Sequence, residues 1–170
     1  MLIRDEDKRE LSVVFIISVI CFVIFIVTHL YINFHEFGHA TACVLFGGNA
    51  TIEKSDYGWE TICYSYGLSE TQTLIFLMAG IGVEIFLAFI LLLIPLTSPL
   101  GAFMVLNVVF NLIRGAYLYD LQQAMVIAPI VAPLLNPIIQ LILFISGLLI
   151  LILSLLYLWW FVKKVDIPYI

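Results

Sequence analysis

The chain has 170 residues, of which 64% are hydrophobic and 11% are charged, and its net charge is −5 at pH 7. Soluble domains are about half apolar and about a quarter charged, so this composition excludes an ordinary soluble fold and predicts an integral, multi-pass membrane protein. The sequence has no basic tract, which excludes a nucleic-acid partner. Its cysteines, Cys21, Cys43 and Cys63, are too few and too scattered for a disulfide framework. Cys21 and Cys43 lie in apolar runs and are interpreted as packing residues.

The first apolar segment, residues 11–46, contains no proline and no glycine before Gly38. This pattern predicts one long helix or a bent pair of helices. A membrane span needs about 20 residues, so the segment exceeds one span. It is also too long for the apolar region of a secretory signal and is expected to be retained. Gly47 and Gly48 follow it and are expected to end the helix.

Residues 49–69 are the only extended polar stretch inside the chain. Residues 51–52 and 59–66 lie on either side of a turn and predict a short strand-like hairpin. Ser69 and Gln72 then have the spacing of a capping box in front of an apolar run. A helix is therefore expected to begin directly after the hairpin.

Three further spans are predicted over residues 71–96, 101–119 and 138–162. Between the last two, residues 121–136 are apolar but contain prolines, which predicts a broken or re-entrant segment that is tolerated only where protein buries it. The predicted fold is a single all-α membrane-embedded domain over residues 1–170. It has about four transmembrane helices, with the hairpin between the first and second and the broken segment before the last.

Positive charge gathers at the two ends of the chain, with three residues before the first span and two after the last: Arg4, Lys8, Arg9, Lys163 and Lys164. Trp159 and Trp160 precede the last two of these and are expected to anchor the helix at the membrane interface. Because four spans return the chain to the side where it began, the positive-inside rule predicts that both termini are cytoplasmic.

An HExxH motif, His35-Glu36-Phe37-Gly38-His39, lies inside the first apolar segment. On a helix the two histidines are four residues apart and fall on one face, so both imidazoles can bind one metal ion. Glu36 lies beside them and is placed to polarise a water on the metal and to carry its proton. Two imidazoles, a carboxylate and an open position suit Zn²⁺, which would generate a nucleophile for a peptide carbonyl.

The motif has an alternative interpretation, because short motifs also arise by chance or cap a helix. Its location favours a metal site. An ionisable residue inside a membrane costs about 2.5–3.5 kcal/mol on insertion scales. Three such residues within five positions therefore need a compensating partner, which a metal ion provides.

Asp120 closes the third predicted span. If the spans alternate in direction, the first and third spans end on the same side of the membrane, so Asp120 can meet the two histidines at a similar depth. Asp120 is therefore the candidate third ligand. The alternative is an interfacial carboxylate paired with Arg114. Glu84 is either an alternative ligand, an acceptor for a substrate backbone, or the partner of Arg114. Asn111 is a candidate for hydrogen bonding between helices or to a substrate strand. It can share a site with Asp120 only if the helix breaks between them, and Gly115 is the expected position of that break.

With these motifs the chain resembles the site-2 protease family of intramembrane zinc metalloproteases, as a compact member without an accessory domain. HEFGH is followed by two glycines and a strand-like segment. Ala79-Gly80 stands in the place of the family's AGPxxN element, and residues 111–120 stand in the place of its NxxPxxxxDG element. Glu84 occupies the position where the family has asparagine, and Arg114 a position where it has proline.

The resemblance implies cleavage of a membrane-tethered substrate in or near the bilayer, with Zn²⁺ on the three candidate ligands and Glu36 as the catalytic residue. The substrate helix has to unwind locally, and the hairpin is placed to bind the unwound strand along its edge, with Ile62 and Tyr64 as candidate substrate-binding residues. The family places its metal nearer the cytoplasmic face, whereas the charge count predicts the opposite side.

The alternative function is a non-catalytic membrane scaffold or escort protein that retains the metal-site fold. Glu36 favours the enzyme, because hydrolysis needs this carboxylate and a scaffold does not. A metal transporter would need ligands at several depths, whereas these residues cluster at one. The expected partners are a membrane-protein substrate and the lipid bilayer.

Overall fold

The computed structural model describes the backbone of residues 5–31, 33–55 and 58–165, and the side chains of residues 10–26, 33–54 and 59–164. The chain is mostly helical, with one two-stranded antiparallel sheet. In chain order the elements are α1 (Asp5–Tyr31), α2 (Phe34–Leu45), β1 (Asn49–Ser55), β2 (Gly58–Tyr64), α3 (Glu70–Leu92), α4 (Ser98–Arg114), α5 (Leu118–Ile127), the 3₁₀ helix η1 (Pro129–Leu135) and α6 (Pro137–Val165).

Two described helices, α3 and α6, are each long and apolar enough to cross a bilayer. Helices α4 and α5 make a third candidate span if the bent pair crosses together, and α1 contains a shorter apolar stretch over Glu10–Ile26. These two to three candidate spans are consistent with a membrane protein. The four spans expected from the sequence stay a prediction.

The first apolar segment forms a bent pair of helices, which was one of the two predicted arrangements. The first helix ends at Tyr31 and α2 begins at Phe34. Asn33 caps α2, because its side-chain oxygen accepts a hydrogen bond of 3.3 Å from the backbone N–H of Glu36. An N-cap of this kind satisfies one of the backbone donors that a helix leaves free at its start. The break frees α2 to pack against α3.

The predicted hairpin is confirmed, with a longer first strand than expected. Strand β1 pairs antiparallel with β2 in a register that places Asn49 opposite Tyr64 and Thr51 opposite Ile62. The hairpin folds back on α2, and Cys43 of α2 forms a disulfide with Cys63 of β2. The interpretation of Cys43 as a packing residue alone was therefore wrong. Sequence spacing could not show that this fold brings the two Cα atoms to 5.8 Å.

The predicted signals downstream of the hairpin are also confirmed. Ser69 and Gln72 form a reciprocal capping box at the start of α3. Helix α4 ends at Gly115, whose φ of 81° is a left-handed conformation that glycine adopts without steric cost. The axes of α4 and α5 differ by 79° across this break. The proline-containing segment after α5 forms η1 rather than a continuous helix.

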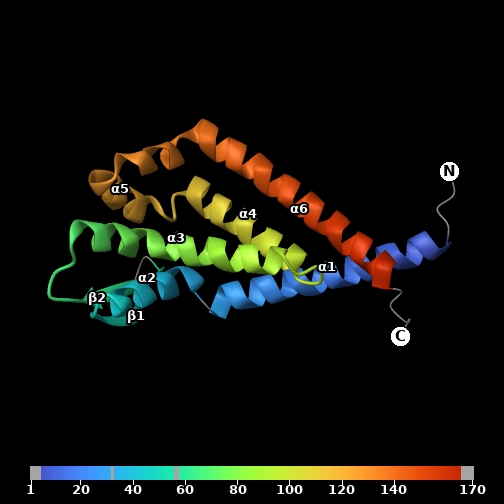
Figure 1. Ribbon diagram of the computed structural model, residues 1–170, viewed down its shortest axis with the longest axis horizontal. Coiled ribbons are helices and arrows are strands. Elements are labelled where there is room, and N and C mark those ends of the chain that lie inside the picture. Colours follow the sequence, from blue (N-terminus) through green and yellow to red (C-terminus); the bar gives the residue numbers. More distant parts are fainter. Residues whose placement is uncertain (1–4, 32, 56–57, 166–170) are drawn as a thin grey trace.

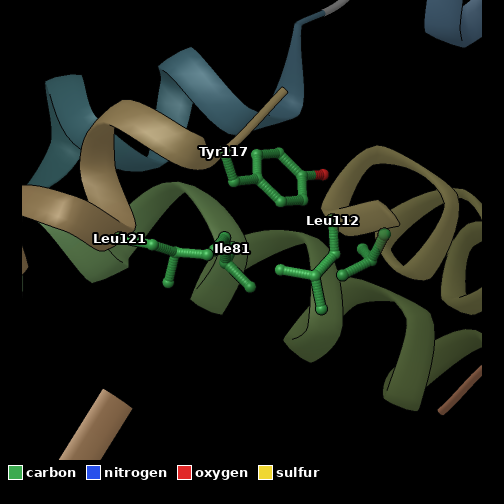
Figure 2. Packing of buried hydrophobic residues seen from close by; sticks show 5 residues of the cluster. Ile81, Leu112, Tyr117 and Leu121 are labelled. Carbon is green, nitrogen blue, oxygen red and sulfur yellow. The ribbon is translucent and has the colours of Figure 1, made fainter. Parts of the chain in front are cut away.

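Helix α1 begins and α6 ends at one end of the molecule, whereas α2, the hairpin and α5 lie at the other end (Figure 1). At the first end, Lys163 of α6 forms an ion pair of 3.3 Å with Glu10 of α1 and lies 4.5 Å from the centre of the Trp159 ring. At the other end, a buried apolar cluster joins α3 to the bent α4–α5 pair: Ile81, Val108, Leu112, Tyr117 and Leu121 (Figure 2). This cluster lies beside the candidate site.

Candidate metal centre

The structure brings His35, His39 and Asp120 together, although Asp120 is 85 residues away from His35 in the sequence. The two Nε2 atoms are 3.0 Å apart, and Asp120 Oδ2 lies 3.1 Å from His35 Nε2 and 3.3 Å from His39 Nε2. Among the described residues, this is the group of His, Cys, Asp and Glu side chains that could hold a metal ion. Its members are the three ligands predicted from the sequence.

These spacings fit a tetrahedral zinc ion. With ligand distances of about 2.0–2.1 Å, neighbouring ligand atoms of such an ion are about 3.3 Å apart. The three sides of the candidate ligand triangle, 3.0, 3.1 and 3.3 Å, agree with that separation. Three protein ligands leave the fourth tetrahedral position open, which is the pattern of catalytic rather than structural zinc sites.

The hydrogen bonding of His39 also suits a metal ligand. Its Nδ1 lies 2.7 Å from the backbone carbonyl oxygen of Phe76 in α3. A carbonyl oxygen only accepts, so Nδ1 carries the proton in this contact. In the neutral imidazole the lone pair is then on Nε2, which faces His35 and Asp120. A second hydrogen bond of this kind orients most metal-binding histidines.

Two glycines allow the close crossing of α2 and α3 that the site requires. A Cβ atom at Gly38 would lie 2.7 Å from the carbonyl carbon of Ala79 and 2.8 Å from the Cα of Gly80. A Cβ atom at Gly80 would lie 2.5 Å from His35 Cε1 and 2.7 Å from His39 Nε2. Small residues let helix backbones approach closely. Here they leave the space that the two imidazoles occupy.

Asp120 reaches the histidines because the chain turns after α4. The left-handed Gly115 ends α4, and α5 then starts at Leu118 in a different direction. This places Asp120 in the first turn of α5, facing α2. The sequence predicted the break at Gly115, but on a straight helix Asp120 would have pointed elsewhere.

Glu36 is buried on α2 next to His35. Its backbone carbonyl accepts a hydrogen bond of 2.9 Å from the hydroxyl of Thr61 in β2. The hairpin is therefore attached directly to the helical turn that carries the HExxH carboxylate. The disulfide between Cys43, in the later part of α2, and Cys63, two residues after Thr61 on β2, makes a second attachment.

The other candidate residues lie in two places. Glu84 and Asn111 are buried and both bind the hydroxyl of Tyr117: this hydroxyl donates to Glu84 Oε2 and accepts from Asn111 Nδ2 at 3.3 Å. Arg114 donates to Asn111 Oδ1 at 3.1 Å. Ile62 and Tyr64 lie on β2, outside the ligand group. Substrate binding by the four candidates stays a prediction: Glu84, Asn111, Ile62 and Tyr64.

Sequence reasoning missed Tyr117 and the Cys43–Cys63 disulfide. The ring of Tyr117 stacks on His35, with centroids 4.6 Å apart and planes 15° from parallel. The one signal for Tyr117 was its place just after the expected break at Gly115. For the disulfide, the signal was the position of Cys63 in the predicted hairpin, directly downstream of the helix that contains Cys43.

Comparison of the chain with protein-family models, with curated proteins and with solved structures found no match. The functional inference therefore rests on the geometry and chemistry of the site itself.

Proposed function

We propose that this chain is an intramembrane zinc metalloprotease of the site-2-protease type, which hydrolyses peptide bonds of membrane-tethered substrates. The observation that carries the proposal is the triangle of His35 Nε2, His39 Nε2 and Asp120 Oδ2, with sides of 3.0–3.3 Å, next to the buried Glu36. Ionisable groups in an apolar helical protein are costly unless they are paired or bind a metal. A site with three protein ligands and an adjacent carboxylate matches the requirements of hydrolysis.

Each residue has a defined part in this reaction. The two histidines and Asp120 would hold Zn²⁺, which supplies Lewis-acid chemistry that acidifies water and polarises a peptide carbonyl. Glu36 takes a proton from the attacking water as the new C–O bond forms. It then delivers that proton to the amide nitrogen as the C–N bond breaks, so that an acid and an amine leave. The contact with Phe76 keeps the proton of His39 on Nδ1 and away from the ligand group.

The hairpin supplies an edge for the substrate. Within the described sheet, β2 pairs with β1 alone, so no described strand occupies its second edge, which is the proposed site for an extended peptide. The hydrogen bond from Thr61 to the Glu36 carbonyl keeps this strand beside the HExxH helix. A substrate added along this edge would present its backbone in the unwound form that hydrolysis needs. Ile62 and Tyr64 on this strand are the proposed contacts.

The site is proposed to face the non-cytoplasmic side of the membrane, with both termini in the cytoplasm. Five of the seven Lys and Arg residues of the sequence lie near the two chain ends, and the positive-inside rule places such clusters in the cytoplasm. The hairpin is at the opposite end of the molecule (Figure 1) and carries the Cys43–Cys63 disulfide. Disulfides persist in oxidising compartments, so charge and disulfide independently favour the same orientation.

Metal content and cleavage test the proposal together. Bound zinc is measured in four detergent-solubilised proteins: the wild type and its His35→Ala, Asp120→Ala and Glu36→Gln variants. The same four proteins are compared for cleavage of fluorescein-labelled casein and of single-span membrane proteins tagged at both ends. We expect about one zinc per chain in the wild type and in Glu36→Gln, and loss of zinc in both ligand variants. Glu36→Gln should cleave at least about 100-fold more slowly than the wild type.

The outcomes separate the alternatives. Zinc in the wild type without cleavage of any substrate would favour the non-catalytic scaffold. Zinc that survives Asp120→Ala would remove Asp120 from the ligand set, with Glu84 the next candidate. A wild type that binds no zinc after supplementation would refute the metalloprotease.

A further inference from the structure

The two histidine ligands are held in different ways. His39 is oriented by its hydrogen bond to the Phe76 carbonyl, whereas the Nδ1 atom of His35 is buried and has no hydrogen-bond partner among the described residues. A metal-binding histidine generally needs a second contact to fix the orientation of its ring. Among the described residues, the second contact of the His35 ring is therefore not a hydrogen bond at Nδ1.

Tyr117 supplies that contact. Its ring lies nearly parallel to the His35 ring, with centroids 4.6 Å apart, and only 3% of the residue is exposed. The ring belongs to the same buried apolar cluster as Leu112 and Leu121 (Figure 2). A ring held in this way restricts rotation of the imidazole that stacks on it.

The hydroxyl end of Tyr117 is held as firmly as its ring. It donates to Glu84 in α3 and accepts from Asn111 in α4, which in turn accepts from Arg114. These partners come from two helices, and Tyr117 itself directly precedes α5. The backbone carbonyl of Tyr117 also accepts from the N–H of Leu121 in the first turn of α5, the turn that carries Asp120. One residue thus contacts His35 and begins the helix of the third ligand.

We propose that Tyr117 is a positioning residue that orients His35 for metal binding. Through the start of α5, Tyr117 also positions Asp120. Glu84 and Asn111 serve to hold the hydroxyl of Tyr117. This inference rests on the proposed metal site. It gives Glu84 and Asn111 a role in shaping the metal site that does not require them to contact substrate.

Metal affinity measured by competition with a chelator tests this role, together with the visible d–d spectrum of Co²⁺ bound in place of zinc. Tyr117→Leu removes the stacking ring, and we expect metal binding to weaken at least about tenfold and the Co²⁺ spectrum to change. Tyr117→Phe keeps the ring and removes only the hydroxyl, so its loss of metal affinity should be smaller than that of Tyr117→Leu. Tyr119→Leu is the matched control, because Tyr119 is two residues away and 72% exposed, and it should bind metal as the wild type does.

Two Glu84 variants test the role of the hydroxyl if Tyr117→Leu fails to fold. Glu84→Gln keeps an oxygen acceptor for the tyrosine and should retain the wild-type affinity and spectrum. Glu84→Ala releases the hydroxyl and should weaken metal binding and alter the spectrum. A merely structural role would lower the melting temperature of the variants and leave the affinity and the Co²⁺ spectrum of the folded protein unchanged.

The results distinguish this inference from the function on which it rests. If the wild type binds one metal ion and the folded Tyr117 and Glu84 variants bind it equally well with the same spectrum, the positioning role is refuted and the metal site stands. If the wild type itself binds no metal, both are refuted.

Discussion

The replacement of Gly80 by alanine gives the sharpest test of the site geometry. The added Cβ atom would lie 2.5 Å from His35 Cε1, 2.6 Å from His35 Nδ1 and 2.7 Å from His39 Nε2, whereas ordinary van der Waals contact begins at 3.4 Å. The imidazoles would have to retreat by about 0.7–0.9 Å, several times the tolerance of about 0.2 Å that a zinc–ligand bond allows. We expect Gly80→Ala to weaken zinc binding at least about 100-fold and to abolish cleavage.

Gly82→Ala is the matched control on the same helix. A Cβ atom at Gly82 would meet nothing within 4 Å, and alanine is a better helix former than glycine. This variant should therefore keep zinc and activity and lose no thermal stability. Zinc affinity is measured by chelator competition on the purified proteins, with circular dichroism to verify folding. A folded Gly80→Ala protein that binds zinc as tightly as the wild type would show that the two imidazoles do not meet the metal beside Gly80.

The disulfide and the strand edge give two further predictions. In the denatured, unreduced protein, Cys21 should be the one cysteine of three that reacts with maleimide, as measured by mass spectrometry. After reduction all three cysteines should react. Three reactive thiols without reduction would contradict the disulfide. Its 20-residue separation corresponds to about 3 kcal/mol, so a paired Cys43→Ala, Cys63→Ala variant should melt at a lower temperature. Ile62→Pro and Tyr64→Pro each remove a backbone donor from β2 and should impair cleavage without loss of zinc; unchanged cleavage would count against strand addition.

Local patterns in the sequence predicted the local structure well. The reciprocal capping box at Ser69 and Gln72, the hairpin after Gly47-Gly48 and the end of α4 at Gly115 all depend on contacts between residues of one short stretch of the sequence. The helical spacing of His35 and His39 likewise brought their Nε2 atoms to 3.0 Å. Interactions of such short range are fixed by backbone geometry that neighbouring residues determine. The number of spans could not be predicted as well, because apolar length alone does not distinguish a crossing from a bent pair.

The tertiary structure decided which distant residues reach the two histidines. Asp120 was proposed as a ligand by counting spans, but its distance of 3.1 Å from His35 exists because the chain turns by 79° after α4. Tyr117 gave no clear signal, because stacking on His35 needs both that turn and the close crossing of α2 and α3. The sequence by itself therefore determined the membrane class, the two histidines and the neighbouring carboxylate. The residue that completes the candidate ligand triangle, and the residues that hold it there, depend on packing between helices, which no local pattern encodes.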